Sequence, residues 1–545
     1  MNNFISKLLY NVFIALIITA LFIAVEQIYR IYNDILSFNL TPKSIAEQFA
    51  INFLIVSIVK TRAILVTYIL IAAFVWFQIL HFAYFGTWIF PLEYLLFFTK
   101  FQETYDTFRT VAEIGIIPTI MILILLISIY YLLRNSEEKR LKIPFLSFVL
   151  IAFIIFVPVR VYVKDSKKGH RPNVEYYPLK NTVVNLGYLF GNIIPKKAMG
   201  NSGLEQPVSP TPNLLTKNPD VNIIMIMGES LNRNFMSLYD YKIKTTPFLD
   251  SIKDDENFVY KKGIASGVVT DVAVPSFFNI IKRPDGVPQI ISTNTCLFKM
   301  AKNNGFQTHF YSSQAQDQLA QLKSYICTKW IDDYVDGTSV TKDIDKPALD
   351  TFLLDKIEEV DFSKPSFVAL QQRASHTPFI DTFPKEFEIF TKENIGDKTI
   401  IQNTIDYANS IHYTDYIISQ LVKKVKEKTN RPTYFIFTSD HASNVGDPNR
   451  QGHGRLNYDA VYQVPFFVYG INNAEVIKDK FSDFEFISHY QMGNVVSKLL
   501  GYEEKYDYFN VREDYFVCDS DISGLSGILK ISFDEESKQT KTLIE

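Results

Sequence analysis

Long apolar segments fill the first 163 residues of the chain, and short apolar runs separated by polar stretches fill the remainder. A helix needs about 20 mostly apolar residues to cross a bilayer, and five early segments approach or reach this length. We therefore predict a transmembrane domain of about five helices over residues 1–163. The second segment is short, so a re-entrant or interfacial position is an alternative for it. The five segments run from Leu8 to Ile28, Phe49 to Val59, Ala63 to Phe85, Ile114 to Leu133 and Ile143 to Val163.

Basic residues in the connections predict how these segments are oriented. Lys7, the Lys60 to Arg62 connection and the loop from Arg134 to Lys142 are basic and alternate with less basic loops. Because Lys and Arg accumulate on the cytoplasmic side of membrane proteins, we place these three clusters in the cytoplasm. Five crossings then leave everything after Val163 on the other side. We expect a multi-pass protein of the bacterial inner membrane whose C-terminal domain lies in the periplasm.

Residues 164–221 have the composition of a linker. The segment is rich in Lys, Asn, Gly and Pro, and it includes Pro207, Pro210 and Pro212. Within it, Tyr176 to Ile194 is amphipathic and aromatic, which is typical of a helix that lies on the membrane surface. We predict a periplasmic linker that carries an interfacial helix.

From residue 222 to residue 545 the pattern is that of an α/β fold. Short apolar runs typical of buried strands alternate with segments of helical periodicity. This alternation predicts an α/β sandwich around a largely parallel sheet, with ligands bound beyond the carboxyl ends of the strands. The predicted strands are Ile223 to Gly228, Thr308 to Ser312, Ser366 to Gln371, Tyr434 to Thr438 and Val464 to Tyr469, and the predicted helices are Thr246 to Ile252, Thr293 to Asn304, Leu349 to Glu359, Ile400 to Lys428 and Ile487 to Leu500.

Composition narrows the function only a little. The net charge of −3 and the pI near 6.3 argue against a nucleic-acid surface, which is normally strongly basic. The three cysteines are too few for a disulfide scaffold and lack the paired spacing of a zinc finger. In an exported domain, Cys296 and Cys327 are the first candidates for a disulfide. The alternative is three separate buried thiols, Cys518 included.

Chemically useful side chains follow two of the predicted strands. Glu229 comes directly after the run Ile223 to Gly228, and Asp440 with His441 follows the run Tyr434 to Thr438. Two carboxylates and an imidazole are ligands that a catalytic zinc uses. Taken singly, each has an ordinary alternative, because a Glu after a strand often caps a helix and an Asp-His pair is common in loops.

A third segment supplies a hydroxyl group. The small-residue turn from Ser266 to Asp271 presents Thr270 ahead of Val274-Pro275-Ser276. A metal ion lowers the pKa of a neighbouring hydroxyl group and so makes it a better nucleophile. The alternative is that Thr270 merely caps the helix that follows. The two acidic strand ends favour the catalytic interpretation.

Together these segments resemble the membrane-bound phosphoethanolamine transferases of the alkaline phosphatase superfamily, which include lipid A-modifying and colistin-resistance enzymes. The resemblance covers the whole chain, namely the five-span anchor, the linker and a series of short motifs. No single motif is specific, but their order and spacing together are. The motifs are Gly228-Glu229-Ser230, Asn232 to Tyr241, Thr245 to Asp250, Thr270 to Pro275, Ser375 to Phe379, Tyr407 to Asp415, Ser439-Asp440-His441 and Gly452-His453-Gly454.

The resemblance implies a metal-dependent transferase with a soluble α/β sandwich domain of the alkaline phosphatase or sulfatase-like type. One Zn²⁺ is expected, a second could bind near two histidines, and Mn²⁺ is the alternative metal. Phosphatidylethanolamine would be the donor, and an envelope glycolipid or glycan, lipid A above all, the acceptor. We expect a monomer that contacts membrane lipids and no nucleic acid. The residues carried over are Glu229, Thr270, Asp440 and His441 for zinc, Thr270 also as nucleophile, and His376 and His453 for the phosphoryl group.

Two features of the sequence depart from the pattern of this family. Family members often have Tyr-Asp-Asn where this chain has Tyr407-Ala408-Asn409, and several have more disulfides than three cysteines allow.

The alternative function is that of a phosphoglycerol transferase similar to lipoteichoic acid synthases, with phosphatidylglycerol as donor. A sulfatase needs Cys or Ser in a Cys/Ser-x-Pro-x-Arg context, which Thr270 to Ala273 does not provide. A non-enzymatic sensor protein would have no reason to keep all four residues that the resemblance assigns to zinc binding, namely Glu229, Thr270, Asp440 and His441.

Gln314 and the segment Gln371-Gln372-Arg373 are further candidates for the donor pocket. Hydrogen bonding at the protein surface is the commoner role of such residues. We therefore expect them at the surface.

Overall fold

Two compact units make up the chain, and each is described separately. The computed structural model describes residues 2–544 apart from 33–39, 86–87, 90, 92, 95–96, 98–114, 135, 165–175, 196–207, 284–286, 317, 320–321, 344–345, 398, 447–451, 457, 477–480, 482–484, 504–513, 521, 523, 525–526 and 534–538. The described residues up to 195 form a helical unit, and those from 208 onward form an α/β unit. Two stretches of the predicted linker, including Pro207, lie outside the described residues.

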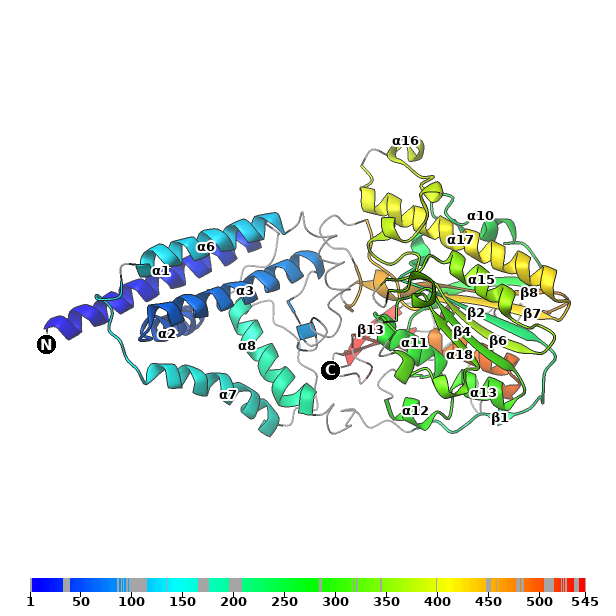
Figure 1. Cartoon of the computed structure of the whole chain (residues 1–545), viewed down its shortest axis with the longest axis horizontal. Coiled ribbons are helices and arrows are strands. Elements are labelled where there is room, and N and C mark those ends of the chain that lie inside the picture. The colour runs from blue at the N-terminus through cyan, green and yellow to red at the C-terminus, as the bar shows by residue number, and fades with distance from the viewer. Residues whose placement is uncertain are drawn as a thin grey trace. The chain divides into compact units, whose positions relative to one another are not determined.

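All five predicted apolar segments are helices of the helical unit (Figure 1). Three of them, α1, α3 and α6, are long and apolar enough to cross a membrane. In α7 the apolar stretch is shorter, and α2 has 15 residues, which at 1.5 Å per residue is about 22 Å. Length and composition thus identify three spans among the described residues, and the prediction of five is not confirmed. The bounds are α1 Asn2–Tyr32, α2 Pro42–Val56, α3 Thr61–Phe85, α6 Ile116–Arg134 and α7 Leu146–Lys164.

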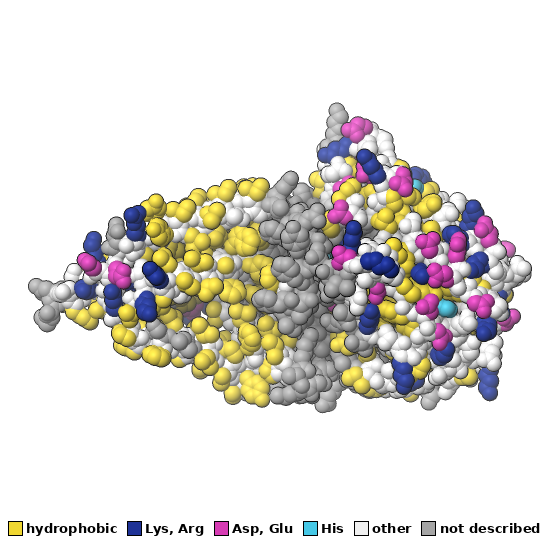
Figure 2. All heavy atoms as spheres, viewed as in Figure 1, with side chains coloured by type: hydrophobic (Ala, Val, Ile, Leu, Met, Phe, Trp, Pro, Cys, Tyr) yellow, Lys and Arg dark blue, Asp and Glu magenta, His cyan; other side chains and the backbone are white. Residues whose placement is uncertain are grey.

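Hydrogen bonds bring the predicted basic connections together at one end of the helical unit. Asn11 Nδ2 donates to Ser57 Oγ at 3.0 Å and to the carbonyl oxygen of Leu141 at 2.8 Å. The Arg140 guanidinium donates to Thr61 Oγ1 at 2.8 Å. Lys and Arg side chains also gather at one end of the apolar surface, at the left of Figure 2. The end of α2, the start of α3 and the loop after α6 therefore share one side, as the charge pattern predicts.

Helix α8 (Pro178–Tyr188) lies at the opposite end of the unit, within the segment Tyr176 to Ile194 for which a helix is predicted. Near the end of α1, Arg30 Nη2 donates to the carbonyl oxygen of Tyr176 at 3.1 Å. Lys180 pairs with Glu47, close to the start of α2, at 3.0 Å. The start of α2 therefore lies near α8, and its end lies near the basic connections.

The α/β unit is built on an eight-stranded sheet with the order β5-β4-β6-β2-β7-β8-β3-β9. All strands except β8 run in the same direction, because β8 pairs antiparallel with both β7 and β3. The largely parallel sheet is confirmed, with one strand reversed inside it. The bounds are β2 Asn222–Gly228, β3 Phe258–Ile264, β4 Gln307–Ser312, β5 Asp333–Asp336, β6 Ser366–Gln371, β7 Thr433–Ser439, β8 Gln463–Ile471 and β9 Phe486–Ser488.

Helices cover both faces of this sheet, which produces the predicted sandwich (Figure 1). Along β2, Ile223 and Met225 enter one apolar core, whereas Ile224 and Ile226 enter the other. Successive side chains of a strand point to opposite faces, so a strand covered on both faces is apolar throughout. The helices on the first face are α11 Thr270–Phe278, α13 Leu297–Asn303 and α18 His489–Leu499, and those on the second are α10 Pro247–Ser251, α15 Thr351–Glu359 and α17 Gln402–Lys428.

The predicted strands and helices of this unit are found, with helix boundaries that differ by up to four residues, and two of these differences have local reasons. The helix predicted from Thr293 begins at Leu297, because Thr293 has a φ of +56°, which is incompatible with a right-handed helix. The helix predicted from Ile487 begins at His489, because Ile487 belongs to β9 and Ser488 caps α18.

Smaller elements complete the unit, and one of them reaches the turn before Thr270. Strands β11 to β13 form a separate antiparallel sheet, and the N–H of Cys518 at its edge donates to the carbonyl of Ser266 at 2.8 Å. Cys518 is buried and does not belong to the disulfide, which joins Cys296 and Cys327. The remaining elements of this unit are β1 Asn213–Leu214, β10 Tyr502–Glu503, β11 Tyr515–Cys518, β12 Ile528–Phe533, β13 Gln539–Ile544, α12 Val287–Ser292, α14 Thr338–Thr341, α16 Lys392–Ile395 and 3₁₀ turns at Arg233–Phe235, Ser237–Tyr239, Leu322–Ser324, Thr328–Trp330, Phe379–Asp381, Lys385–Phe387 and Asp459–Tyr462. In the helical unit, a π-helix at Leu189–Ile193 directly follows α8.

Candidate metal centre

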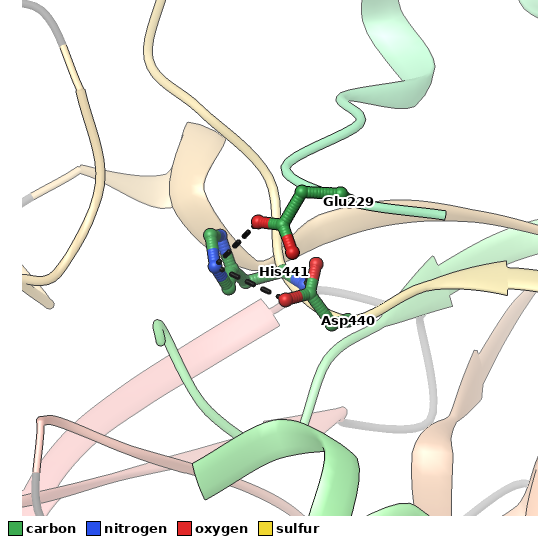
Figure 3. Close-up of side chains that lie close together, drawn as sticks. All are labelled: Glu229, Asp440 and His441. Carbon is green, nitrogen blue, oxygen red and sulfur yellow. Dashed lines mark hydrogen bonds and ion pairs between the residues drawn. The ribbon is translucent and has the colours of Figure 1, made fainter. Parts of the chain in front are cut away.

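Glu229 and Asp440 lie close together because the strands that precede them are neighbours. β2 and β7 pair in parallel, with Gly228 opposite Ser439. Each acidic residue follows its strand at the same edge of the sheet, and the Asp440 N–H donates to the Gly228 carbonyl at 3.1 Å. His441 comes next in the chain. All three side chains are buried, and one ligand atom from each lies within 4.8 Å of the others (Figure 3).

Thr270 brings a hydroxyl group to this cluster from the start of α11. Its Oγ1 donates to Asp440 Oδ2 at 2.7 Å and lies 3.4 Å from both Glu229 Oε2 and His441 Nε2. The N-cap position of α11 belongs to Val269, and it has no side-chain capping bond. The capping alternative for Thr270 is therefore wrong, and its hydroxyl belongs to the cluster.

The distances from the His441 imidazole to the two carboxylates fit a tetrahedral metal ion, whereas Thr270 Oγ1 lies at hydrogen-bond distance from Asp440 Oδ2. Ligand atoms about 2.0–2.1 Å from a tetrahedral zinc lie about 3.3 Å from one another. His441 Nε2 is 3.3 Å from Asp440 Oδ2 and 3.5 Å from Glu229 Oε1. Two carboxylates at such a buried site also repel each other unless a cation or a proton lies between them. These residues could therefore hold one metal ion through carboxylate, imidazole and hydroxyl groups.

Hydrogen bonds orient both carboxylates. Asp440 Oδ1 accepts from the backbone N–H of Ser230 at 3.0 Å and of His441 at 2.7 Å, which leaves Oδ2 toward Thr270. Glu229 Oε1 accepts from Ser230 Oγ, and Glu229 Oε2 accepts from Gln314 Nε2, each at 2.8 Å. The carboxylate oxygens are thus held in place by the protein itself.

His376 and His453 lie beside this cluster on two loops. The His453 ring centroid is 4.2 Å from that of His441 and 6.0 Å from that of His376. His376 Nδ1 lies 2.5 Å from the carbonyl oxygen of Thr377. Because a carbonyl oxygen can only accept, Nδ1 carries the proton and Nε2 offers a lone pair. The structure therefore brings together all six residues singled out in the sequence.

Burial controls the charge of these groups. Burial lowers the pKa of His441 to about 3. Burial, together with the neighbouring His441 ring, lowers the pKa of His453 to about 3 as well. Burial and then the charge of Arg373 hold the pKa of His376 well below its usual range. Burial raises the pKa of Asp440. The three imidazoles are thus neutral at neutral pH, the state in which a histidine nitrogen binds a metal or accepts a proton.

Gln314 and the segment Gln371-Gln372-Arg373 are buried, with at most 6% of any of these residues exposed. The expectation of surface hydrogen bonding is therefore wrong. Gln314 donates to Glu229, and Gln371 Oε1 accepts from Ser312 Oγ at 3.0 Å. A signal was present in the sequence, because these residues follow β4 and β6, whose carboxyl ends lie at the same edge of the sheet as that of β2.

Tyr407 supports the cluster from α17 and is fully buried. Its hydroxyl group donates to the carbonyl oxygen of Ser230 at 2.7 Å and accepts from the N–H of Asn232 at 2.7 Å. It thereby fixes the chain just after Glu229. Tyr407 belongs to a motif noted in the sequence, but its contact with this turn was not apparent there.

Comparison with known proteins gives a consistent result. Residues 221–502, just over half of the chain, match the family model described as Sulfatase. The chain is 21% identical over 345 residues to the Kdo(2)-lipid A phosphoethanolamine 7''-transferase of Escherichia coli (strain K12), with 58% of each chain covered. It is 20% identical over 368 residues to phosphoethanolamine transferase EptA of Helicobacter pylori, with 64% of each chain covered. It thus spans less than two thirds of either relative's length.

One solved structure resembles both units. The integral membrane protein lipooligosaccharide phosphoethanolamine transferase A (EptA) from Neisseria meningitidis superposes with a TM-score of 0.54 at 14% identity, covering 91% of this chain and 95% of that one. At this identity the likeness concerns the fold alone. The family model, by contrast, covers more than half of the chain. This protein therefore belongs to the Sulfatase family, and the two relatives given above are named phosphoethanolamine transferases, as its motifs predict.

Proposed function

We propose that this protein transfers phosphoethanolamine from phosphatidylethanolamine to a hydroxyl or phosphate group on an envelope glycolipid or glycan, with lipid A as the favoured acceptor. The proposal rests above all on the Thr270 hydroxyl, which lies 2.7 Å from Asp440 Oδ2 beside the buried group Glu229, Asp440 and His441. The names of the matched relatives support the choice of transferred group and acceptor.

Transfer would proceed in two steps through an intermediate on Thr270. First, Thr270 Oγ1 attacks the phosphorus atom of the donor, and the bond from phosphorus to the diacylglycerol oxygen breaks. The hydroxyl proton passes toward Asp440 Oδ2, to which it already donates. The leaving diacylglycerol oxygen takes up this proton and departs as the alcohol, and phosphoethanolamine stays on Thr270 as a phosphodiester. An acceptor hydroxyl then attacks the same phosphorus atom, and Thr270 recovers its proton.

Glu229, Thr270, Asp440 and His441 would hold a metal ion, which we take to be Zn²⁺. When bound, such an ion lowers the pKa of a neighbouring hydroxyl group and offsets negative charge on the phosphoryl oxygens. Neutral His441 suits this role, and the two carboxylates compensate the charge of the cation. Mn²⁺ would be compatible with the same donor atoms.

His376 and His453 would act on the phosphoryl group and on the incoming acceptor. His376 presents the lone pair of Nε2, because its Nδ1 proton is held by the Thr377 carbonyl. A neutral imidazole in this state accepts the proton of an acceptor hydroxyl. The close spacing of the His376, His453 and His441 rings also suits a second zinc ion.

The helical unit would hold the enzyme at the membrane that contains its donor. Three apolar helices of spanning length support this anchoring. Confinement to the bilayer replaces a search in three dimensions with one in two. We propose that the basic end lies in the cytoplasm and the α/β unit in the periplasm. The disulfide between Cys296 and Cys327 is in keeping with an oxidising compartment.

The test is the intact mass of the full-length protein after incubation in detergent with zinc and either phosphatidylethanolamine or phosphatidylglycerol. We expect a phosphoethanolamine adduct on the wild-type protein and none on Thr270→Ala. Thr270→Ser is the matched control, because it keeps a hydroxyl group at the same position and should still form the adduct.

The outcomes separate the alternatives. An adduct of phosphoglycerol alone would assign the chain to the rival phosphoglycerol transferases. An adduct that persists in Thr270→Ala would exclude Thr270 as the nucleophile. A zinc-loaded protein that forms no adduct with either lipid would favour a non-enzymatic function.

A further inference from the structure

His489 is a buried imidazole outside the six residues described above. It is the first residue of α18, and its exposed fraction is 0%. Its ring packs edge-on against that of Phe277, with centroids 5.7 Å apart and an interplanar angle of 83°. The ring therefore has a fixed position and orientation between α11 and the carboxyl end of β7.

Both ring nitrogens of His489 have partners of fixed character. Nε2 lies 2.9 Å from the carbonyl oxygen of Ser439. Nδ1 lies 3.3 Å from the backbone nitrogen of Ser266 and 3.2 Å from the hydroxyl oxygen of the same residue. A carbonyl oxygen can only accept and a backbone N–H can only donate, so Nε2 carries the proton and Nδ1 accepts one. Burial lowers the pKa of His489 to about 4, which agrees with a neutral ring in this single tautomer.

The two partners of His489 begin the two segments that meet in the metal centre. Ser439 immediately precedes Asp440 and His441, and Ser266 begins the turn that leads to Thr270. The segments approach each other where Thr270 Oγ1 donates to Asp440 Oδ2. His489 is a second connection between them, made through the Ser439 carbonyl and through the N–H and hydroxyl groups of Ser266.

We propose that His489 is a positioning residue, which holds the Thr270 segment and the Asp440-His441 segment at the separation that the metal centre requires. Its Nε2 contact orients the metal-binding segment, and its Nδ1 contact orients the segment of the nucleophile. The second half of this proposal rests on the proposed function, because it takes Thr270 as the nucleophile. Residues behind metal ligands commonly contribute about 10- to 100-fold to metal affinity or activity.

Two substitutions keep one contact each. The side-chain nitrogen of Gln is the same number of bonds from Cβ as histidine Nε2, so His489→Gln keeps a donor for the Ser439 carbonyl. The side-chain oxygen of Asn takes the place of Nδ1, so His489→Asn keeps an acceptor for the Ser266 N–H. His489→Ala removes both contacts. Phe277→Leu loosens the packing around the ring and keeps both contacts, so it is the control for a purely structural effect.

Two measurements on the full-length protein in detergent separate the two contacts. Competition with a chromogenic chelator gives the zinc affinity, and intact mass against time gives the rate of adduct formation at saturating zinc. We expect His489→Asn to lower the zinc affinity by about 10-fold or more. We expect His489→Gln to keep the zinc affinity within about 3-fold of wild type but to slow adduct formation by about 10-fold or more. His489→Ala should show both losses.

Other patterns would overturn the proposal. If His489→Asn and His489→Gln change only the melting temperature, or change both readouts equally, His489 has no separable positioning role. A loss of zinc affinity in Phe277→Leu as large as that in His489→Asn would assign the effect to packing. The zinc measurement does not depend on phosphoethanolamine transfer, so a wild-type protein that binds zinc without forming an adduct refutes the proposed function and still tests the Ser439 contact.

Discussion

The candidate site combines two groups of residues whose positions are determined differently. Glu229, Asp440 and His441 directly follow the neighbouring strands β2 and β7, so the hydrogen bonds of the sheet determine where they lie. His376 and His453 lie on loops beyond strands. Metal ligands need spacing accurate to a fraction of an ångström, whereas groups that meet a substrate must let it enter and leave. The difference suggests a division between metal binding at the strand ends and substrate handling on the loops.

Glu229, Asp440 and His441 form what we call the strand-end group. Asp440→Asn should have the largest effect, because it changes a ligand of this group. The amide oxygen can still accept from Ser230 and His441, but the amide nitrogen then faces Thr270 in place of an anionic oxygen. We expect the zinc affinity to fall by about 100-fold or more, with no detectable adduct on Thr270. Chelator competition and intact mass measure the two losses. Asp397→Asn, on a half-buried residue outside the site, should bind zinc as wild type does. Retention of zinc by Asp440→Asn would contradict the assignment.

The closeness of the residues in the strand-end group is also the feature of the site that is most readily predicted from the sequence. An apolar run that ends in an acidic residue gives both the strand and the edge of the sheet, and parallel strands share that edge. Thr270 is harder to place, because it begins a helix instead of following a strand. Its proximity to Asp440 arises only when the chain folds back over the sheet.

His376 and His453 form the corresponding loop group. His376→Asn tests this group and should affect turnover more than metal binding. An Asn amide nitrogen can replace Nδ1 as the donor to the Thr377 carbonyl, but nothing replaces the lone pair of Nε2. We expect phosphoethanolamine transfer to slow by about 100-fold while the affinity of the tightest zinc site changes by about 3-fold or less. His376→Gln places an amide group where Nε2 was and should recover part of the rate. A zinc loss as large as in Asp440→Asn would remove the division between the two groups.

Gln314→Ala should have a smaller effect on the strand-end group. Gln314 donates to Glu229 Oε2 at 2.8 Å, so its removal leaves one carboxylate less firmly oriented. We expect the zinc affinity to fall by about 10-fold, with adduct formation restored at high zinc concentration. Gln316→Ala is the matched control, because Gln316 is exposed and only two residues away. Equal zinc affinities in the two variants would show that the sheet alone orients Glu229.

Gln314 and His489 show why the supporting residues are difficult to predict. His489 begins a capped amphipathic helix, and its local sequence resembles that of any such helix. Its partners are the backbone N–H and hydroxyl of Ser266 and the backbone carbonyl of Ser439, which are 223 and 50 residues away in the chain. A contact with a distant backbone group imposes no residue pattern, so only the folded structure identifies it.

Tyr407→Phe should have the smallest effect on function, because it removes a contact one step farther from the metal centre. The substitution leaves the buried N–H of Asn232 without the hydroxyl that accepts from it, at a cost of about 1–3 kcal/mol in the free energy of unfolding. The Ser230 and His441 N–H groups still hold Asp440, so we expect the zinc affinity to stay within about 3-fold of wild type. Thermal unfolding and chelator competition measure the two quantities. If Tyr407→Phe lowers the zinc affinity as much as Gln314→Ala does, the strand-end group depends on α17 as well as on the sheet, and the contrast with the loop histidines becomes one of degree.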